Sequence, residues 1–347
     1  MNKATAFTPA DRPFLAASVG QGQSQSQSPG QGQSQGPGQG QTQRAVLLGL
    51  PFDGTVCYRR GTWKGPDAIR ELSESLETYS PRLDRELDEH GRALAADLGN
   101  IWPDGSDGSD AGDAGDGDGG VGKDARAALS SAGFSEETVA RYLEKVEAAA
   151  RSLFRAGAFP FTLGGEHLVT LPLVRAAAAQ YPGLAVVDFD AHTDLRDEME
   201  GRRLSHATVM RRVLEVIAPD DLHQFGIRSG TKAEFDLARQ GIGSFHETVG
   251  DNPKNALNKL WGRPVYLTID IDVLDPAYAP GTGSPEPGGC TPSELLEAVY
   301  LIAQEHRRGR LRVVGFDLVE VHPDLDPAGL TAIIAAKVVR EALLSLV

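Results

Sequence analysis

The sequence predicts an α/β fold with a mainly parallel central sheet that is covered by helices on both faces. Two observations predict it. Six strand-like segments read as continuous apolar runs, and helical patterns lie between or after them. Strands that are apolar on both sides are typical of parallel sheets buried between helices. Ligands of such sheets bind at the carboxyl ends of the strands, so function is expected where the apolar runs stop.

The expected elements follow from these patterns in chain order. The strands are expected at residues 45–52, 159–165, 184–190, 222–227, 264–272 and 311–321. Helices are expected at 135–157, 291–309 and 327–347. Ser135 and Thr291 precede the first two helices and are natural N-caps. We therefore expect one domain, spanning residues 44–347.

Two low-complexity segments are expected to lie outside the core. Residues 20–43 consist almost entirely of Gly, Gln, Ser and Pro, and none of their side chains could enter a hydrophobic core. Residues 1–43 are therefore predicted to form a disordered tail. The Asp/Gly-rich segment 104–120 is predicted to be a disordered acidic loop inserted into the domain.

Composition limits the function classes. The 347 residues carry a formal net charge of −14, which disfavours nucleic-acid binding and weakly favours cationic ligands or metals. The two cysteines, Cys57 and Cys290, form no CxxC pattern, which fits a reducing compartment. No apolar run is long enough to span a membrane, and the N-terminus lacks the apolar core of a signal peptide. We expect a cytoplasmic protein with no membrane or nucleic-acid partner.

Three expected strands end in potential metal ligands. The segments "LGGEH", "DFDAHTD" and "TIDID" contribute His167, Asp190, His192, Asp194, Asp270 and Asp272. Within the last two segments the ligands are spaced by two residues, so in extended chain they point to the same side. Each segment alone is more often a loop, a helix cap or a satisfied core polar group. Three of them at three strand ends favour one shared site.

The composition of this set predicts a pair of divalent ions. Four carboxylates and two imidazoles without a thiolate suit Mn²⁺ or a related ion better than structural zinc. Six ligands are too many for one tetrahedral ion, whereas two ions sharing carboxylates fit the number. Such a pair lowers the pKa of a bound water and is typical of hydrolytic sites. Two cations would also explain why buried carboxylates are tolerated here.

The motifs together resemble the ureohydrolase family, which includes arginase and agmatinase. The resemblance rests on segments 51–70, 163–167, 188–194, 226–230, 268–289 and 315–323, which occur in family order. Segment 200–212, with Ser-His-Ala, is most similar to the agmatinase branch. The resemblance implies a three-layer α/β/α sandwich and a homo-oligomer, a trimer or hexamer. Ser284 and Cys290 depart from the family pattern, and neither is a ligand.

The resemblance also implies a role for each candidate residue. His167 and Asp194 would bind one Mn²⁺, His192 and Asp272 the other, and Asp190 and Asp270 would bridge both. Asp194 would also accept a hydrogen bond from the bridging hydroxide. His206 would carry a proton to the leaving amine, and Glu320 would hold the substrate guanidinium through paired hydrogen bonds.

The expected reaction is hydrolysis of agmatine, a small cationic guanidino substrate, to putrescine and urea. A sibling activity on guanidinobutyrate, arginine or another guanidino compound stays open, because Arg196, Arg202 and Arg203 could meet a carboxylate. A one-zinc deacylase is disfavoured because His167 and Asp272 would have no role in it. A non-enzymatic binding protein is disfavoured because all six ligand positions, His206 and Glu320 are present.

Overall fold

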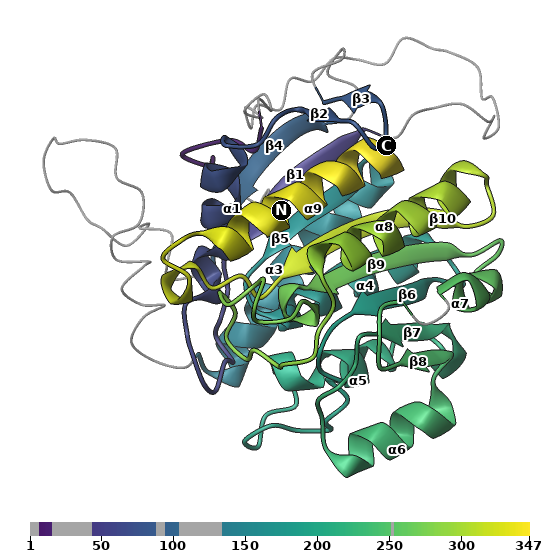
Figure 1. Ribbon diagram of the computed structural model, residues 1–347. Helices are drawn as coiled ribbons and strands as arrows, with labels where there is room; N and C mark the ends of the chain where they lie inside the picture. The colour runs from purple at the N-terminus through teal and green to yellow at the C-terminus, as the bar shows by residue number, and fades with distance from the viewer. Residues whose placement is uncertain (1–6, 16–43, 88–93, 104–133, 251–252) are drawn as a thin grey trace, which may run out of the picture.

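The structure is a computed structural model that describes residues 7–15, 44–87, 94–103, 134–250 and 253–347. An eight-stranded sheet in the order β4-β1-β5-β10-β9-β6-β7-β8 crosses the molecule (Figure 1). All strand pairs in it are parallel. The strands are β1 Ala45–Leu50, β4 Leu94–Asn100, β5 Phe159–Gly164, β6 Ala185–Phe189, β7 Leu222–Phe225, β8 Ser244–His246, β9 Pro264–Asp270 and β10 Arg312–Val319.

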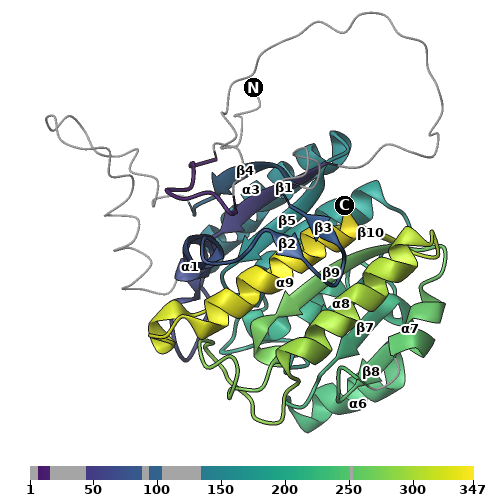
Figure 2. The ribbon, with the colours of Figure 1, turned by 45° about the horizontal axis from the view of Figure 1, so that its top comes forward.

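Helices cover both faces of this sheet. One face packs against α1 (Gly65–Ser73), α7 (Pro253–Lys259), α8 (Pro292–Arg307) and α9 (Leu330–Leu346). The other packs against α3 (Glu136–Arg155), α4 (Thr170–Gln180), α5 (Val209–Val213) and α6 (Lys232–Gly241). Figures 1 and 2 show α8 and α9 in front of the sheet and α3 behind it. The expected three-layer α/β/α sandwich is confirmed.

The expected elements are present, with shorter bounds. All six predicted strands form, and the structure adds the two edge strands β4 and β8. A small antiparallel pair, β2 (Tyr79–Ser80) and β3 (Arg85–Glu86), lies outside the main sheet. Both predicted N-caps are confirmed, because the Ser135 and Thr291 hydroxyls accept the backbone N–H of the third residue of each helix, at 3.2 Å. Among the described residues, no helix is long and apolar enough to cross a membrane.

Residues 7–15 lie against the domain, and this corrects the predicted tail at that segment. Thr8 exchanges two backbone hydrogen bonds with Asn100 at the end of β4, at 2.9 and 2.7 Å. Phe14 is fully buried in the core, and its N–H donates to the Asp97 carboxylate at 3.1 Å. These contacts depend on an edge strand that the sequence patterns did not predict. Segments 20–43 and 104–120 lie outside the described residues.

The sheet order explains where the polar strand ends meet. Strands β5, β10, β9 and β6 are consecutive neighbours at its centre. Their carboxyl ends lead into His167, Glu320, Asp270 and Asp190. Because parallel strands end at the same edge, residues distant in sequence come together there.

Candidate metal centre and active site

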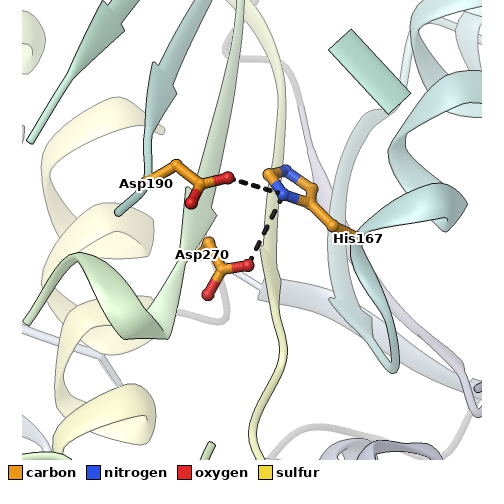
Figure 3. Close-up of side chains that lie close together, drawn as sticks. All are labelled: His167, Asp190 and Asp270. Atoms are coloured by element: carbon orange, nitrogen blue, oxygen red, sulfur yellow. Dashed lines mark ion pairs between the residues drawn. The ribbon is translucent and has the colours of Figure 1, made fainter. Parts of the chain in front are cut away.

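One group of candidate ligands gathers around His167. This residue opens a short 3-10 turn, His167–Val169, three residues after β5 ends. Its Nδ1 lies 3.0 Å from Asp190 Oδ2, 3.4 Å from Asp194 Oδ2 and 3.5 Å from Asp270 Oδ2. Figure 3 shows Asp190 and Asp270 pointing at this nitrogen from their own strand ends. Three carboxylates thus face one imidazole nitrogen.

A second group gathers around His192. Its Nδ1 lies 2.9 Å from Asp272 Oδ2 and 3.6 Å from Asp190 Oδ1. Asp190 therefore faces both imidazoles, one with each oxygen, as a bridging ligand would. Asp270 faces the first group with Oδ2, while its Oδ1 accepts the backbone N–H of Asp272 at 2.8 Å. Ligand atoms lie close enough together to hold a metal ion in two sets: one of His167, Asp190 and Asp270, and one of Asp190, His192 and Asp272.

The hydrogen bonding of these atoms fits a role as metal ligands. His167 Nδ1 and Asp190 Oδ2 are fully buried, yet neither has a hydrogen-bond partner in the part of the chain that is described. Buried polar atoms are normally paired, because an unpaired one costs about 1–3 kcal/mol. Two such atoms only 3.0 Å apart mark a place where both could bind the same ion.

The electrostatics point the same way. Burial, and then the charges of Asp272 and Asp190, raise the pKa of Asp270 well above its usual range. Burial and the charge of Asp190 raise the pKa of Asp194 to about 7. Burial opposes protonation of His167, but Asp190 and Asp194 outweigh it and raise its pKa well above normal. The site therefore attracts positive charge, and divalent ions would supply it in place of protons.

Two site residues hold unusual backbone conformations. Asp194 has φ +50° and Glu320 has φ +66°, in the left-handed region that non-glycine residues rarely adopt. Asp194 follows β6 and Glu320 follows β10, so each strained residue lies at the edge of the sheet where ligands are expected. Such strain persists where the surrounding structure fixes it, and it often accompanies functional sites.

A cavity of about 300 Å³ opens onto the metal ligands. It brings together all the predicted site residues except His167 and Asp190, which are buried and do not line it. The predicted residues on its wall are His192, Asp194, His206, Asp270, Asp272 and Glu320, and the remaining lining includes Cys57, Arg196, Met199, Glu234 and Ser284. Substrate in this cavity would therefore touch four of the six predicted ligands, together with His206 and Glu320.

His206 is held in a defined orientation on the cavity wall. Its backbone N–H donates to Thr55 Oγ1 at 3.1 Å, and its Nδ1 lies 3.2 Å from the Thr55 carbonyl oxygen. A carbonyl oxygen only accepts, so Nδ1 carries the proton and Nε2 keeps its lone pair. Nε2 lies 3.7 Å from Cys57 Sγ. Burial, with the charges of His192 and His167, lowers the pKa of His206 to about 4.

Thr55 is itself held by Glu166, which the sequence reasoning missed. The Glu166 carboxylate is fully buried and accepts both the backbone N–H of Thr55, at 2.8 Å, and its hydroxyl. Burial raises the pKa of Glu166 to about 8. Only its place beside His167 in "LGGEH" could have indicated a role.

Glu320 is tied to the same turn from the other side. Its Oε1 accepts the backbone N–H of His167 at 2.8 Å, and its own N–H donates to the Gly165 carbonyl at 2.7 Å. Burial and the charge of Glu166 raise its pKa well above the usual range. The residue is 9% exposed and lines the cavity, so it can still reach a bound ligand.

Of the three arginines considered for a carboxylate-bearing substrate, only Arg196 lines the cavity. Arg202 donates to the Phe134 carbonyl at 2.9 Å, and Arg203 pairs with Glu215 at 2.8 Å. Arg196 Nε lies 3.6 Å from the carboxylate of Glu234, which also lines the cavity. The charge of Arg196 is therefore partly balanced within the cavity wall.

Comparisons with known proteins agree with this geometry. Residues 43–345 match the Arginase family. The chain is 44% identical over 301 residues to an agmatinase from Bacillus anthracis, covering 86% of this chain and 90% of that relative. An agmatinase from Bacillus subtilis (strain 168) is 44% identical over 304 residues, with 87% and 92% covered. The N(1)-aminopropylagmatine ureohydrolase of Thermococcus kodakarensis is 35% identical over 302 residues, with 83% and 87% covered.

The fold agrees as well. The crystal structure of the agmatine ureohydrolase of Thermoplasma volcanium superposes with a TM-score of 0.66 at 29% identity, covering 88% of this chain and 90% of that one. The family implies a binuclear metal site, and the two buried His/Asp groups are consistent with it. This chain therefore belongs to the arginase family of ureohydrolases, and within that family it is agmatinase-like.

Proposed function

We propose that this chain hydrolyses agmatine to putrescine and urea with two Mn²⁺ bound at the candidate metal centre. The observation that carries the proposal is Asp190, whose two oxygens face the two imidazoles of His167 and His192 separately. One carboxylate between two ligand groups is the arrangement that a pair of ions requires. The six side chains that would hold the ions are His167, Asp190, His192, Asp194, Asp270 and Asp272.

The oxygen-rich ligand set supports manganese over zinc, because no thiolate is present and carboxylates outnumber imidazoles. When bound, the two ions would supply a water of lowered pKa, the strong nucleophile that a resonance-stabilised guanidinium needs. Asp194 lines the cavity beside these ligands and would accept a hydrogen bond from that nucleophile. Its carboxylate would thereby orient the attack on the guanidinium carbon.

Glu320 would hold the guanidinium. A carboxylate and a guanidinium form paired, charge-assisted hydrogen bonds, which fix both position and orientation. Because Oε1 already accepts the His167 N–H, Glu320 is anchored to the turn that carries a metal ligand. The substrate carbon would therefore be placed relative to the metal centre by a single short chain of contacts.

His206 would move a proton to the leaving amine. With Nδ1 bonded to Thr55, Nε2 is the only ring atom whose lone pair can take up a proton. A pKa lowered to about 4 keeps the ring neutral at pH 7. A proton that Nε2 takes up from the attacking water would pass to the leaving amine, and this returns the ring to its neutral state.

The wall of the cavity supports a cationic tail on the substrate. Of the three candidate arginines, only Arg196 lines the cavity, and the carboxylate of Glu234 partly balances its charge. Once two divalent ions balance the four aspartates, the other carboxylates on the cavity wall are Glu234 and Glu320, and this favours an ammonium over a carboxylate. A carboxylate-bearing guanidino compound is the second candidate, favoured only if Arg196 turns away from Glu234.

The oligomeric state and location belong to the same proposal. We expect a trimer or hexamer, as the family resemblance implies, working in the cytoplasm. Both cysteines are free, which supports a reducing compartment.

Urea release from a panel of guanidino compounds tests the proposal. The kcat/KM for agmatine should exceed the values for guanidinobutyrate and for arginine by about tenfold or more. One hydrogen bond between the charged tail of the substrate and the cavity contributes about 1.5–3 kcal/mol. Arg196→Gln should not lower the turnover of agmatine, but it should reduce the turnover of guanidinobutyrate. A panel in which no compound releases urea, or arginine is preferred, would contradict the assignment.

A further inference from the structure

A buried row of polar side chains crosses the sheet one layer below the metal ligands. Five neighbouring strands each place a polar residue at the same level, in register with the next strand. All five are fully buried: Thr162, Asp317, Thr268, Asp188 and Gln224, on β5, β10, β9, β6 and β7. Such residues are rare in the interior of a parallel sheet, whose strands are usually apolar throughout. The reaction proposed above uses none of them.

The row is bonded to the side chain of a candidate metal ligand through Thr268. His167 Nε2 lies 3.0 Å from Thr268 Oγ1, on the side of the ring away from Asp190. The Thr268 hydroxyl donates to Asp317 Oδ1 at 2.5 Å, and the Tyr266 hydroxyl donates to Asp317 Oδ2 at 2.8 Å. A chain of hydrogen bonds thus runs from a candidate metal ligand to a carboxylate inside the sheet.

The direction of these hydrogen bonds determines which ring nitrogen of His167 carries the proton that faces Thr268. An ionised carboxylate only accepts, so the single proton of the Thr268 hydroxyl points to Asp317. Toward His167 the same hydroxyl can then only accept, and Nε2 must carry the ring proton. In the neutral ring that binds metal, Nδ1 is therefore left with its lone pair, facing the three carboxylates of the metal centre.

We propose that Thr268 and Asp317 are positioning residues that hold His167 with Nδ1 ready to bind metal. This inference rests on the proposed function, because it takes His167 to be a metal ligand. Ligand histidines commonly donate their second N–H to a fixed acceptor, and loss of that acceptor typically weakens metal binding about 10–100-fold. Asp188 Oδ1, at 3.9 Å from Nε2, is too distant to replace Thr268.

Three substitutions of buried threonines test the proposal. Thr268→Val removes the hydroxyl and keeps the shape, whereas Thr268→Ser keeps the hydroxyl. Thr162→Val is the matched control, because Thr162 flanks Asp317 at the same level and its hydroxyl has no hydrogen-bond partner within the described residues. Mn²⁺ affinity and stoichiometry are measured by titration of the metal-free proteins, with folding checked by circular dichroism.

We expect Thr268→Val to bind one of its two Mn²⁺ about 10–100-fold more weakly than wild type, with Thr268→Ser and Thr162→Val unchanged. If Thr268→Val does not fold, Tyr266→Phe takes its place, because it removes only the hydroxyl that donates to Asp317, and should weaken one site severalfold.

Wild-type affinity at both sites in the tested variant overturns the inference, and so does an equal loss in Thr162→Val or Thr268→Ser. A wild-type protein that binds fewer than two Mn²⁺ overturns the proposed function itself, and the inference with it. The two failures are therefore distinguishable from the wild-type titration alone.

Discussion

His206 and Glu320 line the same cavity but would act at different stages of the reaction. Glu320→Gln removes a charge-assisted contact to the guanidinium, worth about 1.5–3 kcal/mol, or about 10–100-fold. Because the contact also orients the reacting carbon, kcat should fall and KM should rise. His206→Asn should lower kcat by about 10²–10⁴-fold with little change in KM.

Kinetics and bound metal are measured on the same two preparations, because neither residue is a proposed ligand. A His206→Asn protein that loses a metal ion would contradict this division of roles. So would a Glu320→Gln protein that turns over agmatine as fast as wild type.

His223, on β7, gives the fold a pH dependence that is separate from the reaction. Burial, and then the charge of Lys259, lower the pKa of this imidazole to about 4, whereas in the unfolded chain it is about 6.5. Below pH 6.5 the unfolded chain takes up a proton that the folded state refuses until about pH 4. Stability due to the neutral ring is therefore complete above pH 6.5 and is lost as the pH falls toward 4.

The unfolding free energy of the metal-free protein at pH 7 and pH 5 tests this effect. From pH 7 to pH 5, the unfolding free energy of wild type should fall by about 2 kcal/mol more than that of His223→Leu, which cannot titrate at this position. Using metal-free protein removes the competition between protons and Mn²⁺ at the metal centre. An identical pH dependence in the two proteins would show that His223 does not contribute.

The candidate ligands could be predicted from the sequence, whereas the residues that support them could not. Asp190 and Asp270 stand at the ends of apolar runs, and a carboxylate at a strand end is a local mark of a site. Asp317 and Thr268 lie inside such runs, where a single polar residue has many structural explanations. Their role depends on which strands are neighbours, and the sequence patterns did not give the strand order.

At the scale of elements, the sheet was predicted well at its centre and poorly at its edges. The central strands β5, β6, β9 and β10 are long apolar runs, because both of their faces are buried. Edge strand β4, "LAADLGN", carries Asp97 and ends in Gly99 and Asn100, and these polar and small residues weaken the strand pattern. Burial on both faces, which produces the pattern, is incomplete at an edge.

The segment 7–15 depends on this unpredicted edge, and it should contribute to stability. Phe14 is fully buried, so Phe14→Ala should destabilise the protein by about 3–5 kcal/mol. Arg12→Ala is the control in the same segment, because its ion pair with Glu74 is exposed and should contribute less than about 1 kcal/mol. Urea unfolding curves measure both, and a Phe14→Ala loss no larger than that of Arg12→Ala would mean that the segment does not anchor to the domain in solution.

At the scale of the whole molecule, the fold itself assembles the metal centre. The candidate ligands span positions 167 to 272, and strands β5, β9 and β6 bring them to one edge of the sheet only when the chain is folded. An unfolded chain offers no such site, so metal binding should favour the folded state. The trimeric or hexameric state stays a prediction from the family resemblance.

The most direct test of the account is the metal content of the active protein. Metal-free chain is titrated with Mn²⁺ while urea release from agmatine and bound metal per chain are measured in the same samples. Activity should rise until two Mn²⁺ are bound per chain. Asp190→Ala, which removes the carboxylate shared by both groups, should bind neither ion tightly. Full activity with a single zinc ion per chain, or full activity without metal, would contradict the proposed two-ion centre.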